Sequence, residues 1–341
     1  MVSLLRLDRG TTFRSCGQGQ KWYNINMKIL FITLTNIGDA ILTTPIIDIL
    51  HTRFPSAKIF VLCGERAGEI FENDPYVYKI IPYNKKIGLK RKACLVFNLF
   101  KQRFDLVVDL RNSLIPYLVF PKRFAVNYGG GKKNIHSVDR SLEVLKKLKL
   151  DTKNANLRVV ISKQNEKRAL EILNEYSLFS KRFICICPGA KSSLKRYPED
   201  SFSSVADNLT QMGFDIVLLG EKSEKHICEN ILSKMKNKAF DLSGQADLKT
   251  SGAVLKKSRL VISNDTALMH LANALNVPVL GIFGPTDAAK YGPRGGKAVV
   301  VRSMLNCSPC EKAQCPLGKR QCMESISPED IINACIFLLN S

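Results

Sequence analysis

Short apolar runs alternate with amphipathic segments from Lys28 onward, which is the pattern of a parallel sheet whose strands are joined by helices. After the first run comes a segment with Ile41, Ile46, Ile47 and Leu50 on one helical face, and the proline after Phe54 ends it. The other apolar runs of the first half predict further buried strands. The strand predictions are KILFITL (28–34), KIFVLCG (58–64), YKIIPY (78–83) and FDLVVDL (104–110).

The same alternation starts again in the second half of the chain. Its strand predictions are FICICPG (183–189), DIVLLG (215–220), LVISND (260–265) and VLGIFG (279–284), with helices expected near 166–175, 202–212, 227–235 and 267–274. We therefore expect an α/β protein with two doubly wound, Rossmann-like domains facing a cleft. The boundaries we predict are 27–165 for the first domain, 166–327 for the second and 328–341 for a C-terminal helix. Residues 1–26 are polar and aperiodic, as in a disordered extension or a misassigned start.

Composition and charge narrow the kind of partner. The 341 residues suit two domains, and 51 Lys and Arg against 30 Asp and Glu leave a net charge of +21. That charge favours phosphate-rich partners: nucleic acid, an anionic membrane or a phosphorylated glycolipid. The basic residues are scattered and no DNA- or RNA-binding motif is visible, which weighs against nucleic acid. No apolar run reaches the roughly 18 residues of a membrane helix and no signal peptide is evident, so we expect a cytoplasmic protein.

A first polar motif, Asn36-Ile37-Gly38-Asp39, follows the first strand. A carboxylate in a turn facing a cleft can take a proton from a sugar hydroxyl, so Asp39 is a candidate general base. An aspartate that caps the following helix would produce the same pattern, and spacing alone favours that simpler interpretation.

A second motif, residues 188–198, follows the strand FICIC and contains Gly189, Ala190, Lys191 and Lys195. Backbone amides, hydroxyls and a lysine in one loop after a strand can neutralise a diphosphate. The spacing excludes a Walker loop. A solvated basic loop is the alternative.

A third motif, Ser263-Asn264-Asp265-Thr266-Ala267-Leu268-Met269-His270, joins a strand to a helix. The first helical amides and the Thr266 hydroxyl would form an anion pocket, with His270 one turn further on. Alternatively, Asp265 caps the helix and His270 packs against the sheet. Thr286 and Asp287 end the next strand and are candidates for the same cleft.

Taken together and in order, these motifs resemble glycosyltransferase family 9, the ADP-heptose:lipopolysaccharide heptosyltransferases (heptosyltransferase II-like), from about Met27 to Leu339. The resemblance implies a GT-B fold and an inverting, metal-independent transfer of a heptose or related sugar from ADP-heptose to a lipopolysaccharide core or other lipid-linked acceptor. It implies that Asp39 is the general base and that Lys195 binds the donor diphosphate. The chain contains no Asp-x-Asp, which agrees with metal independence.

The resemblance extends to further donor-side positions. Glu224 matches the acidic residue that contacts the ribose, and Asp265, Thr266 and His270 match a segment near the diphosphate and the heptose. Ala190 and Lys191 stand where members often have threonine or serine. Thr286, a candidate from its place after a strand, is added to the donor side. A different donor or a sugar-nucleotide epimerase remains an alternative, as does, less favoured, a nucleic-acid-binding protein.

The acceptor side is predicted from basic residues. The segment Lys79–Arg103 contains eight Lys and Arg and no acidic residue. It suits binding to an anionic glycolipid or to the inner face of the cytoplasmic membrane. A solvated basic loop is the alternative interpretation. Asn36 and a histidine that resembles an acceptor-side residue of the family, His136, join this group. The acceptor-binding candidates are Asn36, Lys90, Arg91, Lys92 and His136.

Four cysteines cluster at 307–322 with the spacing Cys-x₂-Cys-x₄-Cys-x₆-Cys. Such a set is a candidate for a structural zinc, although paired Cys-x-x-Cys knuckles are missing. We expect no cofactor to be required for transfer. The candidate ligands are Cys307, Cys310, Cys315 and Cys322.

Overall fold

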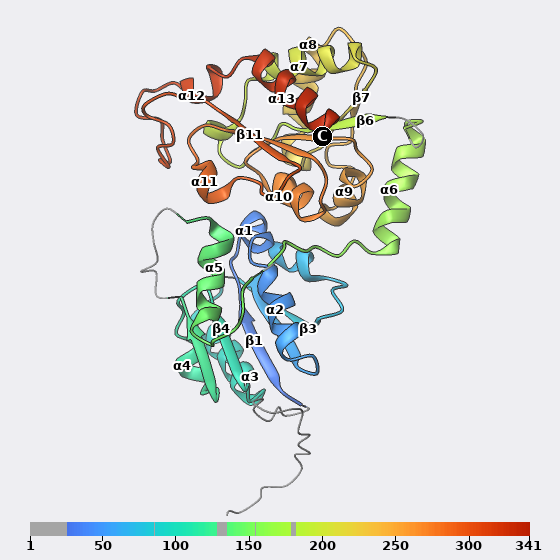
Figure 1. The fold of residues 1–341 in the computed structure, drawn as a ribbon. Coiled ribbons are helices and arrows are strands. Elements are labelled where there is room, and N and C mark those ends of the chain that lie inside the picture. The colour runs from blue at the N-terminus through green and yellow to red at the C-terminus, as the bar shows by residue number, and fades with distance from the viewer. Residues whose placement is uncertain (1–25, 85, 128–134, 154, 179–181) are drawn as a thin grey trace, which may run out of the picture. The chain divides into compact units, whose positions relative to one another are not determined.

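The computed structural model describes residues 26–84, 86–127, 135–153, 155–178 and 182–341. The predicted N-terminal extension lies outside these residues, except for Asn26. Contacts divide the chain into two compact units. Unit 1 comprises Met1–Thr35, Pro45–Gly131 and Ser141–Ala155, and unit 2 comprises Asn36–Thr44, Lys132–Arg140 and Asn156–Ser341. Each unit is built on its own parallel sheet (Figure 1).

Unit 1 contains a five-stranded parallel sheet in the order β3-β2-β1-β4-β5. Its strands are β1 (Lys28–Ile32), β2 (Lys58–Gly64), β3 (Val77–Tyr83), β4 (Leu106–Asp109) and β5 (Arg123–Val126). The accompanying helices are η1 (Arg66–Phe71), α2 (Pro45–Arg53), α3 (Leu89–Lys101), α4 (Ile115–Val119) and α5 (Ser137–Lys146), which begins in residues of unit 2. The central strand β1 is buried from Ile29 to Ile32, as its unbroken apolar run predicts.

Strand β3 differs from the prediction of a buried strand. It pairs only with β2 among the described strands, and Tyr78 is 57% exposed. An edge strand has one free side and tolerates polar positions, so YKIIPY fits an edge better than a core. Strand β5 was missed, because its exposed Arg123 and Phe124 break the apolar run.

Unit 2 contains a six-stranded parallel sheet in the order β11-β10-β9-β6-β7-β8. Its strands are β6 (Phe183–Cys187), β7 (Asp215–Leu218), β8 (Phe240–Asp241), β9 (Val261–Asn264), β10 (Val279–Phe283) and β11 (Ala298–Arg302). Strands β7 and β8 are added on one side of β6, and β9, β10 and β11 are then added on its other side. The order of the strands therefore reverses between β6 and β9, where open α/β sheets bind ligands.

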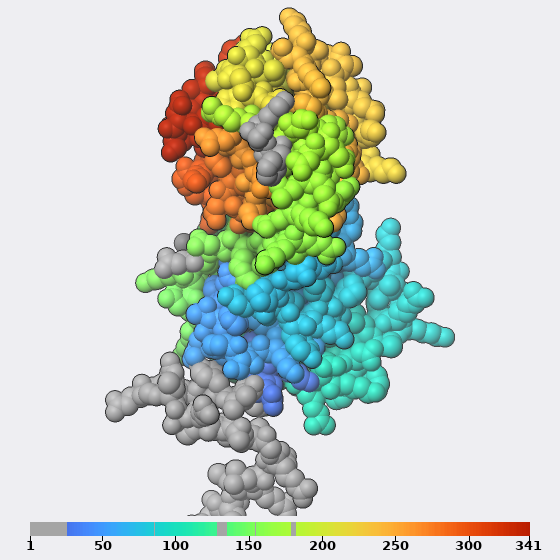
Figure 2. Space-filling view, turned by 90° about the vertical axis from the view of Figure 1, so that its right-hand side faces the viewer, coloured from blue at the N-terminus to red at the C-terminus, as the bar shows by residue number. Residues whose placement is uncertain are grey.

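Several helices accompany the sheet of unit 2. They are α1 (Ile37–Ile41), α6 (Lys163–Glu175), η2 (Ser193–Lys195), α7 (Glu199–Gln211), η3 (Lys222–Glu224), α8 (Lys225–Lys234), α9 (Leu248–Leu255), α10 (Ala267–Ala274), α11 (Ala288–Tyr291), α12 (Gln321–Glu324) and α13 (Pro328–Asn340). Helix α6, light green in Figure 2, lies at the surface and packs on α9, while α13 packs on α7. Among the described residues, no helix combines the length and apolar character needed to cross a bilayer.

Candidate active site

Two loops at the carboxyl ends of β6 and β9 meet through an ion pair. Lys195, at the end of η2, donates from Nζ to Oδ2 of Asp265 at 2.6 Å. The lysine side chain is 35% exposed and the aspartate side chain 9%, so the cation remains open to solvent while the anion is enclosed. The pair lies where the strand order reverses, and it joins the second and third sequence motifs.

Asp265 is held as a carboxylate by its neighbours. Burial by itself raises its pKa, but the hydrogen bond and charge of His270, together with the charge of Lys195, lower the pKa to about 2. The Nε2 atom of His270 lies 3.7 Å from Oδ1 of Asp265, and the imidazole is almost completely buried. Asp265 therefore links a partly exposed cation to a buried imidazole.

The N-terminus of α10 lies beside the Lys195–Asp265 pair. Thr266 is its N-cap, and its hydroxyl accepts from the backbone N–H of Met269 at 3.4 Å and lies 3.1 Å from Oγ of Ser263. Asp265 precedes the cap, so the interpretation of Asp265 as the N-cap is wrong. The first amides of α10 supply the partial positive charge that an anion requires.

Asn264 fixes the loop that carries Lys195, a role that the sequence did not reveal. Its fully buried side chain donates from Nδ2 to the carbonyl of Pro188 at 2.7 Å and accepts from the N–H of Tyr197 at 3.1 Å. One amide thus ties both ends of the 188–197 loop to β9. The position of Asn264 inside the third motif was the available signal.

Glu224 reaches the same edge of the sheet from the loop after β7. Its Oε2 accepts from the N–H of Glu221 at 2.9 Å, which closes the turn of η3. The carboxyl group packs against Gly189, where a Cβ atom would overlap it. The glycine of the second motif therefore makes room for the predicted ribose ligand.

The other donor-side candidates lie around these loops. Ala190 is buried, and its carbonyl accepts from Nε of Arg196 at 2.9 Å. Lys191 is exposed. Thr286 follows β10, the neighbour of β9, and Asp287 caps α11 by accepting from the N–H of Ala289 at 2.9 Å.

Asp39 belongs to a short helix that packs against α10. Gly38 meets His270 closely enough that a Cβ atom would lie 2.9 Å from Cδ2 of the imidazole, so glycine is required for this approach. Asn36 occupies the N-cap position of α1 and donates from Nδ2 to Oδ2 of Asp39 at 2.9 Å. Asp39 is the third residue of the helix and not its cap. Within unit 2, contacts thus run from Lys195 through Asp265 and His270 to the residue beside Asp39.

His136 is occupied by internal hydrogen bonds. Nδ1 accepts from the N–H of Val138 at 3.2 Å, which leaves Nε2 as the donor to the carbonyl of Gly292 at 2.9 Å. Burial, with a smaller contribution from the charge of Arg294, lowers the pKa of His136 to about 4. Both ring nitrogens are thus engaged in hydrogen bonds within the protein, and neither is directed to a sugar acceptor in this arrangement. The other acceptor-side candidates, Lys90, Arg91 and Lys92, begin α3 in unit 1.

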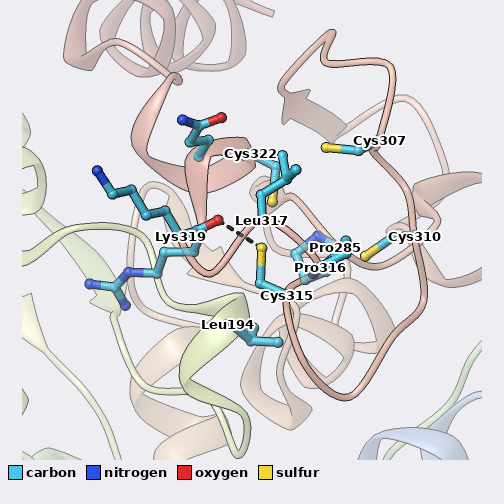
Figure 3. Close-up of a pocket in the computed structure, with 11 residues that line it drawn as sticks. Leu194, Pro285, Cys307, Cys310, Cys315, Pro316, Leu317, Lys319 and Cys322 are labelled. Atoms are coloured by element: carbon cyan, nitrogen blue, oxygen red, sulfur yellow. Dashed lines mark hydrogen bonds between the residues drawn. The ribbon is translucent and has the colours of Figure 1, made fainter.

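The four clustered cysteines line one pocket (Figure 3). Burial and the three neighbouring thiols raise the pKa of Cys322, and Sγ of Cys315 donates to the carbonyl of Lys319 at 2.7 Å. In the part of the chain that the structure describes, no three His, Cys, Asp or Glu side chains are arranged as metal ligands. The structural zinc stays a prediction. Leu194, next to Lys195, lines the same pocket.

The two parallel-sheet α/β units give the chain the GT-B fold, and the Lys195–Asp265 pair lies at the carboxyl ends of the strands of unit 2. The fold matches a glycosyl transferase family 9 structure from Veillonella parvula DSM 2008 with a TM-score of 0.80 at 23% identity, covering 92% of this chain and 97% of the other. It also matches the Escherichia coli structure described as ADP-heptose lps heptosyltransferase II, with a TM-score of 0.74 at 24% identity and coverage of 92% and 99%.

The chain belongs to glycosyltransferase family 9 (heptosyltransferase), whose family model matches residues 94–321. Lipopolysaccharide heptosyltransferase 2 of Escherichia coli (strain K12) is 25% identical to it over 339 residues, covering 90% of this chain and 97% of the relative. The predictions of the family, the fold class and a glycosyltransferase activity are confirmed.

Proposed function

We propose that this enzyme transfers a heptose or a related sugar from ADP-heptose to a lipopolysaccharide core or another lipid-linked acceptor, with inversion at the anomeric carbon. Support comes from the relatives named for lipopolysaccharide heptose transfer and from a site whose chemistry suits a diphosphate leaving group. The proposal puts the reaction at the inner face of the cytoplasmic membrane, where a lipid-linked acceptor is accessible.

The observation that carries the proposal is the Lys195–Asp265 pair beside the N-terminus of α10. When the bond from the anomeric carbon to the diphosphate oxygen breaks, negative charge grows on the leaving group. A partly exposed ammonium and the amides of a helix N-terminus stabilise that charge more in the transition state than in the ground state. Glu224, packed on Gly189, is proposed to bind the ribose.

Asp39 is proposed to accept the proton of the attacking hydroxyl. Its carboxylate is half-buried and oriented by Asn36, and its helix packs on the one that contains His270. A single displacement needs one base and one electrophilic pocket, and it inverts the configuration. Lys195 supplies a cation for the leaving group, so we propose transfer without a divalent ion and without a cofactor. A zinc at the cysteine cluster would be structural.

Replacing Lys195 by alanine tests the donor site. We expect the Kd for ADP, measured by calorimetry, to rise about 10- to 100-fold, because a charge-assisted hydrogen bond is lost and the Asp265 carboxylate then faces the diphosphate. Lys234→Ala is the matched control, since it removes another ion-paired lysine, at the end of α8, where Nζ contacts Asp200 at 2.7 Å.

The control variant is expected to bind ADP like the unaltered enzyme, and thermal unfolding checks that both variants fold. Unchanged ADP affinity in folded Lys195→Ala would overturn the donor-site assignment. A thermal-shift panel of ADP-, UDP-, GDP- and CMP-sugars tests the nucleotide separately: stabilisation by an ADP-sugar alone is expected. Stabilisation by a sugar linked to another nucleotide would show that the donor is not ADP-heptose.

A further inference from the structure

Exposed apolar side chains are concentrated on one part of unit 1. Of the fourteen large hydrophobic side chains that are exposed in the described residues, eight lie between Leu89 and Phe124. The most exposed of these eight are Leu89 at 84%, Phe120 at 78% and Leu114 at 73%. Single exposed apolar residues are ordinary, but a group of this size on a soluble unit marks an interaction surface.

These side chains stand on packed elements. Helices α3 and α4 are in contact, with the rings of Phe100 and Phe120 6.4 Å apart between centroids. The rings of Tyr117 and Phe124 lie 5.2 Å apart, which connects α4 to β5. Phe97 and Phe100 are three residues apart on α3 and therefore share a helical face. We call this surface, formed by α3, α4 and Phe120–Phe124, the aromatic face.

Beneath the aromatic face the same elements are anchored in the core. Leu99 of α3, Val119 of α4 and Phe104 are buried in one cluster with β1 and β2. Inward positions are thus already filled by other apolar residues. The exposed rings are surplus to the packing of unit 1, so a structural role in the core does not account for them.

The charge around the aromatic face is positive. Residues 89–124 contain eight Lys and Arg and only two acidic residues, Asp105 and Asp109. Asp109 is fully buried and accepts from the N–H groups of Arg111 and Ser113 at 2.7 Å. Asp105 contacts Lys122 at 2.7 Å, and its side chain is only 15% exposed. The charge presented to solvent is therefore that of the basic residues, among them Lys90, Arg91 and Lys101.

We propose that the aromatic face docks the enzyme on the surface of an anionic phospholipid bilayer. Aromatic rings favour the boundary between headgroups and acyl chains, and the surrounding Lys and Arg are attracted to an anionic leaflet. A second copy of the chain is a poorer occupant, because a two-fold axis would bring the same basic residues against each other. Membrane docking is a property separate from sugar transfer, and it brings the enzyme to the surface that holds a lipid-linked acceptor.

The test is co-sedimentation of the full-length protein with vesicles, without any sugar nucleotide. We expect binding to vesicles of phosphatidylcholine with 30% phosphatidylglycerol, weakening as salt is added, and little binding to phosphatidylcholine alone. The double variant Phe97→Gln, Phe120→Asn removes two rings from the aromatic face. Asparagine suits residue 120 because Phe120 has φ +46°, a left-handed conformation that asparagine tolerates.

The double variant is expected to bind anionic vesicles at least about tenfold more weakly than the unaltered protein. The matched control, Phe337→Gln, changes a 63% exposed ring on α13 of unit 2 and is expected to bind normally. Calorimetry with ADP is expected to give the same Kd for all three proteins. A failure of vesicle binding can thus be told apart from a failure of the donor site.

Three outcomes would overturn the proposal. The first is that the unaltered protein fails to sediment with anionic vesicles, and the second is that the folded double variant sediments as strongly as Phe337→Gln. The third is that analytical ultracentrifugation shows the unaltered protein as a dimer and the double variant as a monomer. The last result would assign the aromatic face to a second copy of the chain.

Discussion

Asp39 lies in the first turn of α1 and accepts a hydrogen bond from Asn36. Asp39→Asn keeps the size of the side chain and removes its ability to take a proton. We expect kcat to fall by about 10²- to 10⁴-fold, the usual contribution of a general base, while the Kd for ADP stays within about twofold. Single-turnover transfer and ADP calorimetry measure the two effects. Wild-type turnover in this variant would exclude Asp39 as the base.

His136 makes the stability of the protein depend on pH. Its pKa is about 4 in the folded chain against 6.5 as the ordinary value, so between these pH values the unfolded chain binds more protons. The contribution of His136 is complete above about pH 6.5 and is lost as the pH falls toward 4. From pH 8 to pH 5 we expect it to lower the free energy of unfolding by about 2 kcal/mol.

Urea unfolding at several pH values, compared with His136→Asn, measures this effect. Asparagine can still donate to the carbonyl of Gly292 but does not titrate, so its pH profile should be flatter. His226→Asn, at an exposed position of α8, should keep the profile of the unaltered protein. Parallel profiles for all three proteins would contradict the assignment.

At the scale of elements, the loop with Lys195 is supported from the cysteine-rich segment. Nη1 of Arg320 donates to the carbonyls of Ser193 at 3.1 Å and Arg196 at 3.3 Å, on either side of Lys195. Arg320→Ala should therefore raise the Kd for ADP by about three- to tenfold, because two hydrogen bonds that position the loop are lost. Calorimetry with Arg302→Ala, an exposed arginine at the end of β11, is the comparison. Equal affinities in the two variants would show that Arg320 does not position the loop.

The sequence predicted most of the described strands because buried parallel strands have continuous apolar runs. Helix α10 was expected at 267–274 and is found there. What escaped prediction depended on tertiary contacts. The close approach of Gly38 to His270 joins residues more than two hundred positions apart, and no local pattern distinguishes that glycine from one in a turn. The role of Asn264 and the internal bonds of His136 are hidden for the same reason.

At the scale of the molecule, the two-unit α/β organisation followed from the repeated alternation of strands and helices. Which residues belong to each unit could not be predicted in this way. Residues 36–44 and 135–140 lie in the first half of the sequence, yet their contacts assign them to unit 2. The bidentate pair of Arg294 with Asp139, at 3.0 and 2.6 Å, is one such contact. Composition and periodicity cannot reveal a segment that is built into a distant domain, because the determining partners are far away in sequence.

The 2.6 Å contact between Lys195 and Asp265 has a consequence for turnover. In the proposed reaction the lysine already has an internal counter-ion, so a diphosphate enters by exchange with a carboxylate instead of binding to a bare cation. The affinity for ADP then reflects the difference between two anions. After transfer, the same carboxylate competes with the product for the lysine, and the site returns to its paired state as ADP departs. In the proposed reaction, competition from Asp265 would therefore limit how long ADP stays bound.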